Sequence, residues 1–126
     1  MSDNSTLIDA AKAAASIFSD ARTDGMPSPY AVSLYPTNAA LALHFAHIHD
    51  LERWATWRGV TETHTADTLP DALPTYAVDV LINGSRHKHA TLRCVMHGVR
   101  VIAMASGRAD AAEEAAAIAG RAVVSA

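Results

Sequence analysis

Hydrophobic and polar positions alternate most regularly in residues 75–106, where runs rich in β-branched residues are separated by turn signals. The runs cover residues 76–82, 88–96 and 99–105, and the turn signals are Asn83-Gly84-Ser85 and His97-Gly98. Alternation broken by short glycine-containing turns is typical of antiparallel strands joined by tight loops. The sequence therefore predicts a meander of three strands.

The second turn predicts which side chains share a face of this meander. A two-residue loop with His97 and Gly98 both at positive φ fixes the pairing of the strands on either side of it. One face is then wholly apolar, with Met96 opposite Val99, Cys94 opposite Val101 and Leu92 opposite Ala103. The other face is mixed, with Val95 opposite Arg100, Arg93 opposite Ile102 and Thr91 opposite Met104. We expect the first face to be buried and the second to face outward.

The first turn needs a different loop. Asn83-Gly84 is typical of a two-residue loop, but that loop would set Val80 opposite His87 and mix an apolar row with a polar one. A loop of three residues, 83–85, or of five, 83–87, instead puts Tyr76, Val78 and Val80 on the face of Ala90, Leu92 and Cys94. We therefore predict a longer loop. The outer face then carries Asp79, His87 or His89, Thr91, Arg93 and Arg100, beside Leu81, Ile102 and Met104.

Two segments near the ends of the chain have helical patterns. Leu7, Ala11, Ala14, Phe18 and Ala21 line one stripe, which predicts a helix over about 7–22. The Ala-rich segment 108–119 has acidic residues early and Arg121 just after it, which favours a second helix. We predict that both helices pack on one face of the sheet.

The remaining elements are less regular. Residues 30–35 alternate as a half-exposed strand does, and the Thr-rich residues 60–66 predict a strand near a sheet edge. Between them, residues 40–46 fit a strand followed by a short helix over 51–58, because Asp50 is a good N-cap and Gly59 a good stop. The alternative is one continuous helix over 38–58.

These elements give the fold class. We predict an α+β fold with a mostly antiparallel sheet, made of the central meander over 76–105 plus strands near 30–35, 40–46 and 60–66, with N- and C-terminal helices on one face. The 126 residues suit a single domain over 1–126, because smaller parts would bury too little surface. Ala makes up roughly a fifth of the chain, so large core side chains are few. An oligomer interface would compensate for that shortage.

Charge and cysteine usage narrow the classes of function. A formal net charge of −3 disfavours bulk attraction to nucleic acid or an anionic membrane. The chain has no apolar run as long as a membrane span and no signal-peptide pattern at its start, so we expect a cytoplasmic protein without a membrane partner. The lone Cys94 excludes an internal disulfide and is expected as a small buried hydrophobe. Eight Arg against two Lys, with so much Ala, is typical of a GC-rich bacterial genome.

The seven histidines suggest one alternative function, a metal site. His47 and His49, and likewise His87 and His89, have the spacing that puts two imidazoles on one side of a strand, where four such nitrogens could bind zinc. No Glu or second Cys completes a recognised ligand spacing. We therefore favour a protein without a cofactor and keep the metal site as an alternative.

A basic hairpin tip suggests a second alternative, contact with nucleic acid. Arg86 and Lys88, with Arg93 further along the strand, could contact phosphates as a β-ribbon, although a basic tip also keeps an exposed hairpin soluble. Catalysis is disfavoured because the sequence has no glycine-rich phosphate loop and no nucleophile elbow. Asp79 could orient His89 across the meander, but no Ser nucleophile can be assigned to the pair.

The leading hypothesis is a non-catalytic protein-interaction module that self-associates or binds another protein. It explains the few large core residues and the mixed outer face of the meander. Tryptophans partly exposed on a helix are enriched at interfaces, which adds Trp54 and Trp57 to the candidates. The predicted interaction surface comprises Trp54, Trp57, Leu81, Arg93, Arg100, Ile102 and Met104.

Overall fold

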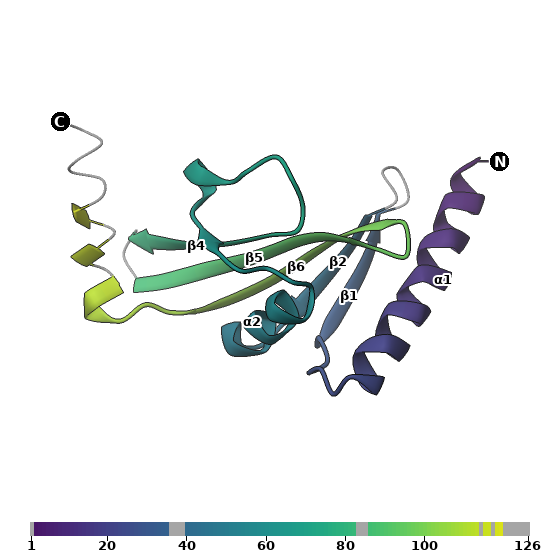
Figure 1. Ribbon diagram of the computed structural model, residues 1–126, viewed down its shortest axis with the longest axis horizontal. Coiled ribbons are helices and arrows are strands. Elements are labelled where there is room, and N and C mark those ends of the chain that lie inside the picture. The colour runs from purple at the N-terminus through teal and green to yellow at the C-terminus, as the bar shows by residue number, and fades with distance from the viewer. Residues whose placement is uncertain (1, 36–39, 83–85, 114, 117, 120–126) are drawn as a thin grey trace.

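The computed structural model describes residues 2–35, 40–82, 86–113, 115–116 and 118–119. Its elements in chain order are α1 (Ser2–Thr23), β1 (Ala31–Tyr35), β2 (Ala40–Phe45), α2 (Ile48–Trp57), β3 (Thr63–His64), the short 3-10 helix η1 (Ala66–Thr68), β4 (Thr75–Ile82), β5 (Arg86–Met96) and β6 (Val99–Arg108). In Figure 1, α2 lies below the sheet and the loop that carries η1 lies above it. The α+β class is confirmed.

The sheet contains both parallel and antiparallel strand pairs, so the prediction of a mostly antiparallel sheet is confirmed only in part. Its six strands follow the order β1-β2-β6-β5-β4-β3. The pairs β2–β6 and β3–β4 are parallel, and the other three pairs are antiparallel. A strand alternates in the same way whether its neighbour is parallel or antiparallel, so the sequence pattern could not reveal that β6 lies beside β2.

The predicted register of the meander is confirmed at both turns. His97 and Gly98 have φ values of 51° and 76°, and the three apolar pairs between β5 and β6 are those expected from a two-residue loop. Between β4 and β5, Tyr76 pairs with Leu92 and Ile82 pairs with Arg86, which is the register of a three-residue connection. The connecting residues 83–85 lie outside the described residues.

The inner face of the sheet carries the core. Leu41, Leu43 and Phe45 of β2 lie in register with Val101, Ala103 and Ala105 of β6, and α1 and α2 pack on this face. The largest fully buried side chains are Trp54, Ile17, Leu41, Leu43, Leu51, Leu92 and Val101. Val78 and Val80 are only half-buried, because their end of the β4–β5 hairpin projects beyond α2 (Figure 1).

The prediction for residues 38–58 is confirmed in its favoured form. Ala40–Phe45 is a strand and Ile48–Trp57 a separate helix, so the continuous helix over 38–58 is wrong. The N-cap is His47 rather than Asp50. The helix begins one turn earlier than expected because Ile48 is an inward-facing residue that packs against the sheet.

The C-terminal part of the prediction needs correction. β6 continues to Arg108, and Gly107 allows the close approach of Ile48, whose Cδ1 lies 3.1 Å from where a Cβ on Gly107 would sit. Residues 111–113, 115–116 and 118–119 are helical, but all of them except the half-buried Glu113 are exposed. The inner face is therefore covered by the N-terminal helix α1, as predicted, and by α2 in place of the C-terminal helix.

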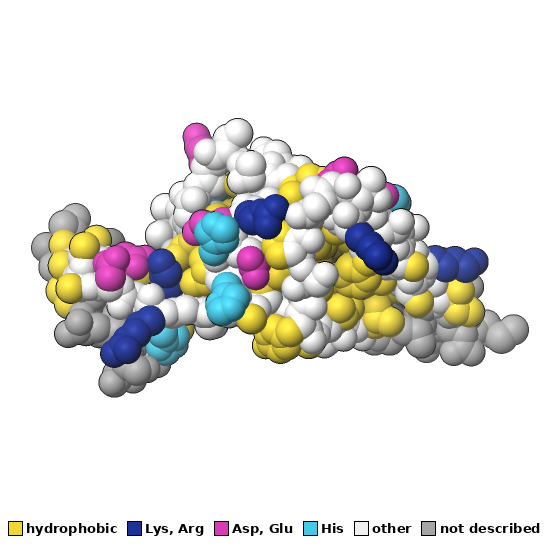
Figure 2. Space-filling view, turned by 90° about the horizontal axis from the view of Figure 1, so that it is seen from below, with side chains coloured by type: hydrophobic (Ala, Val, Ile, Leu, Met, Phe, Trp, Pro, Cys, Tyr) yellow, Lys and Arg dark blue, Asp and Glu magenta, His cyan; other side chains and the backbone are white. Residues whose placement is uncertain are grey.

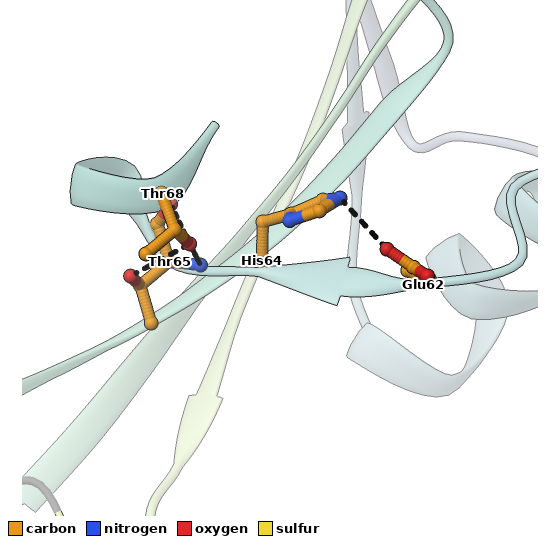
Figure 3. A network of polar contacts seen from close by, with 4 residues as sticks. All are labelled: Glu62, His64, Thr65 and Thr68. Atoms are coloured by element: carbon orange, nitrogen blue, oxygen red, sulfur yellow. Dashed lines mark hydrogen bonds and ion pairs between the residues drawn. The ribbon is translucent and has the colours of Figure 1, made fainter. Parts of the chain in front are cut away.

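The expected strand over 60–66 is mostly irregular chain. Only Thr63 and His64 pair with β4. Next comes η1, where the Thr65 backbone N–H donates to Thr68 Oγ1 over 3.0 Å (Figure 3). Threonine side chains that bond the local backbone compete with strand pairing, which explains why the alternating pattern misled here.

The single thiol is a testable feature of this core. Cys94 is 3 % exposed, and burial raises its pKa to about 11. Because the thiolate is the reactive form, we expect Cys94 to react with Ellman's reagent at pH 8 far more slowly in the folded chain than in guanidinium chloride. Equal rates in the two conditions would contradict the predicted inner face.

Candidate interaction surface

The strand register aligns the outer face of the sheet into rows that cross four strands. One row contains Tyr35, Ala40, Arg100 and Val95, from β1, β2, β6 and β5 in that order. The next row contains Ser33, Ala42, Ile102 and Arg93 from the same strands. We call these eight residues the outer patch. Because side chains alternate along a strand, all of them point to the face opposite the core.

The outer patch combines exposed large side chains with a floor of small ones. Tyr35 and Val95 are 47 % and 49 % exposed, and both arginines of the patch are exposed. Ala40 and Ala42 lie between these larger side chains and are only 2 % and 1 % exposed. β1 and β2 thus contribute small residues, apart from Tyr35, while β6 and β5 contribute large ones.

Part of the outer face beyond this patch is covered by the chain itself. Thr75 and Ala77 of β4 point outward by register but are 2 % and 4 % exposed, under the loop that carries η1 (Figure 1). The backbone N–H of Ala66 donates to Asp79 Oδ1 over 2.9 Å, which fixes that loop to β4. The loop therefore covers the start of β4 on the outer face, and the outer patch lies beside the part that it covers.

The predicted interaction residues are divided by the structure. Arg93, Arg100, Ile102 and Met104 lie together on neighbouring strands, with Met104 in the row next to the outer patch. Leu81 is 37 % exposed but pairs with His87 at the far end of the β4–β5 hairpin. The two tryptophans lie on α2, which packs on the inner face.

The inclusion of Trp54 in the interaction surface is wrong. Its side chain is 0 % exposed, its Nε1 donates to the Pro27 carbonyl over 2.7 Å, and its ring centroid lies 5.3 Å from that of Phe45. Trp57 is half-buried and its Nε1 donates to Asp24 Oδ2 over 2.8 Å. Residues three apart lie on the same side of a helix, so the spacing of the two tryptophans does not show which one points inward.

Lys88 and Arg93, two of the three basic residues of the nucleic-acid alternative, lie on opposite faces of the sheet. Lys88 points to the inner face and its Nζ lies 2.8 Å from Glu113 Oε2, a hydrogen bond that raises the pKa of Lys88. Arg93 points to the outer face, and the side chain of Arg86 lies outside the described residues. On the side that carries α2, the Lys and Arg side chains lie in separate spots rather than in one field (Figure 2).

The four histidines of the metal alternative are divided between the start of α2 and β5. His47 and His49 lie at the start of α2 rather than on a strand, so their spacing no longer puts them on one side. His87 and His89 are on β5, and the His89 Nδ1 lies 3.0 Å from Ser106 Oγ. In the described part of the chain, no three His, Cys, Asp or Glu side chains gather as a metal site requires.

One polar row of the outer face has the residue types of a hydrolytic triad. Asp79, His89 and Ser106 are aligned across β4, β5 and β6. Ser106 was missed in the sequence because the last strand was expected to end before it. The Asp79 carboxylate, however, accepts the Ala66 N–H, and the serine hydroxyl meets Nδ1, the nitrogen that a triad aspartate would occupy. The row is therefore not assembled as a Ser-His-Asp triad.

Known proteins give no information on the function of this chain. The chain matches no protein-family model, no curated protein and no solved structure. Within the described ranges, no helix has the length and apolar character needed to cross a membrane.

Proposed function

We propose that the chain is a non-catalytic interaction module that self-associates through the outer patch. The observation that carries the proposal is the size pattern of its two rows, small residues on β1 and β2 beside large residues on β6 and β5. Homodimers most often have two-fold symmetry, in which one surface contacts its own copy. A surface with large side chains on one half and small side chains on the other is complementary to itself under such a rotation, because the large side chains of each copy meet the small ones of the second.

The pairing can be derived from the register. We place the two-fold axis parallel to the strands and between β2 and β6. Ile102 of one copy then lies over the small Ala42 of the other, and Arg100 lies over Ala40. At the flanks, Val95 meets Tyr35 and Arg93 meets Ser33. Each large side chain thus has a small or flat counterpart, as face-to-face sheet packing at about 10 Å requires.

The charge pattern suits the same arrangement. The axis separates like charges, since Arg93 faces the Ser33 hydroxyl and Arg100 faces a methyl group beside the Tyr35 ring of the second copy. Arginine stacks well on aromatic rings and is enriched at interfaces together with tyrosine. The apolar Tyr35, Val95 and Ile102 provide the area whose burial stabilises the dimer.

A charge pair at position 33 tests this proposal. Ser33→Arg places a cation opposite Arg93 of the second copy, and Ser33→Asp places an anion there. We expect the arginine variant to raise the dimer dissociation constant about tenfold and the aspartate variant to lower it, as measured by sedimentation velocity over micromolar concentrations. Within one copy, residues 33 and 93 are three strand spacings apart, about 14 Å, so their own interaction is largely screened.

The two variants control for each other, because both replace the same half-buried serine with a charged side chain. Melting temperatures identify any loss of folding. A strict monomer for the unmodified chain, or the same shift for both charges, would show that the outer patch is not the interface.

A further inference from the structure

A hollow on the helix side of the sheet has polar walls and lies away from the outer patch. It has a volume of about 360 Å³ and lies between α2 and the segment that leads into β3. Its polar lining includes Glu52, Thr56, Glu62, Thr63 and Tyr76. Small-molecule sites begin at about this volume.

One group in this lining has no partner in the described chain. Tyr76 is 4 % exposed, and its hydroxyl is buried without a hydrogen bond. Burial and then the negative charge of Glu52 raise the pKa of Tyr76, so the phenol stays protonated. Both residues line the hollow. A buried hydroxyl without a partner costs free energy, which favours a ligand that supplies the missing hydrogen bond.

The charges of the lining select the class of ligand. Glu52 and Glu62 are negative, and no Lys, Arg or His is among the residues that line the hollow. Glu62 is 77 % exposed and lies 3.9 Å from His64 Nε2, so this long contact leaves its carboxylate accessible at the rim (Figure 3). Lys88, a nearby cation, is held by Glu113 over 2.8 Å. The hollow therefore attracts cations and repels anions.

We propose that this hollow binds a primary ammonium group, with the Glu52 carboxylate and the Tyr76 hydroxyl oxygen as its acceptors. An ammonium group has three donors, which match a carboxylate, the phenol and the Thr56 hydroxyl. Its charge-assisted bond to the carboxylate is the strong contact. The ammonium group can belong to a free alkylamine or to a lysine side chain of a partner protein.

Calorimetric titration with butylammonium chloride tests the site, with butan-1-ol as the neutral probe. We expect saturable binding of butylammonium only. Glu52→Gln should weaken that binding about tenfold or more, and Tyr76→Phe several-fold, while Tyr30→Phe, which changes an exposed tyrosine outside the hollow, should leave it unchanged. Equal binding of the two probes, no saturable binding, or wild-type affinity in both variants would overturn the proposal.

Stability supplies an independent readout. Because Tyr76→Phe removes a buried hydroxyl that has no partner, we expect the melting temperature of the variant to equal or exceed that of the unmodified chain without ligand. A clear fall in melting temperature would mean that the hydroxyl has a structural role, and would overturn the assignment of Tyr76 as a ligand-binding group.

The two sources of the ammonium group are separated by a peptide pair. An acetylated, amidated peptide with one lysine is compared with the same peptide carrying norleucine. Tighter binding of the lysine peptide than of butylammonium, lost with norleucine, identifies a protein partner. Affinity no better than that of butylammonium identifies a free amine. Dimerisation through the outer patch is measured separately, so either proposal can fail alone.

Discussion

Replacing Trp54 with alanine should lower the free energy of unfolding by about 3–5 kcal/mol, among the largest losses from any single truncation in this chain. The side chain is fully buried between α2 and the sheet, and it contacts Phe45 on one side and Trp57 on the other. Its removal leaves a cavity and also removes the hydrogen bond to the Pro27 carbonyl. Denaturant unfolding followed by circular dichroism measures the loss.

Trp57→Ala is the matched control for this prediction. Trp57 lies on the same helix and also donates a hydrogen bond, to Asp24, but it is only half-buried. Its truncation should cost clearly less than half as much as that of Trp54. Equal losses would mean that Trp54 is not the inward-facing tryptophan, and would reopen its assignment to an interaction surface.

Leu92→Ala should cost about 2–5 kcal/mol, because Leu92 is fully buried at the centre of the inner face. It pairs with Tyr76 on one side and with Ala103 on the other, so few neighbours can move to fill the cavity. Thr91, its chain neighbour, points to the outer face and is half-buried. Thr91→Ala should cost well under 1 kcal/mol.

The comparison of these neighbouring positions tests the orientation of the sheet. Leu92 and Thr91 are neighbours on one strand and their side chains point to opposite faces. The two substitutions therefore share the same local backbone and differ only in the face that they change. Equilibrium unfolding in urea gives both values. A larger loss for Thr91→Ala than for Leu92→Ala would mean that the inner and outer faces are exchanged.

The register of the meander was predictable because two constraints act on it together. Alternation fixes which residues of a strand share a face, and turn length fixes which face of the next strand joins them. The apolar rows around Leu92 agreed only with a three- or five-residue loop after Ile82, and the structure has the three-residue register. His97-Gly98 gave the second turn directly, since its positive φ values suit a two-residue loop.

The outer patch could not be predicted in full, because half of it depends on a long-range parallel pairing. Arg93, Arg100 and Ile102 were recognised from the meander alone. Their neighbours Ala40 and Ala42 come from a strand that precedes β6 by more than fifty residues, and alternation does not identify which strand lies beside it. The only available signal was that small residues occupy one face of residues 40–43.

The hollow at Tyr76 was hidden from the sequence for a similar reason. Tyr76 was assigned correctly to the inner face, where an apolar contact was expected. That its hydroxyl would be buried without a partner, in a hollow that Glu52 also lines, depends on the position of the helix over the sheet, which no local pattern specifies. The irregular chain before β3, expected as a strand, completes the lining.

A double-mutant cycle on the dimer dissociation constant tests the outer patch most directly. Tyr35 and Val95 lie at opposite ends of one row, separated by β2 and β6, so within one copy they are about 14 Å apart and do not touch. In the proposed dimer, each contacts the other residue of the second copy. Tyr35→Ala and Val95→Ala should therefore each weaken association, and the double variant should lose less than their sum by about 0.5–1.5 kcal/mol per contact. Additive losses, or an unmodified chain that stays monomeric, would contradict self-association through this face.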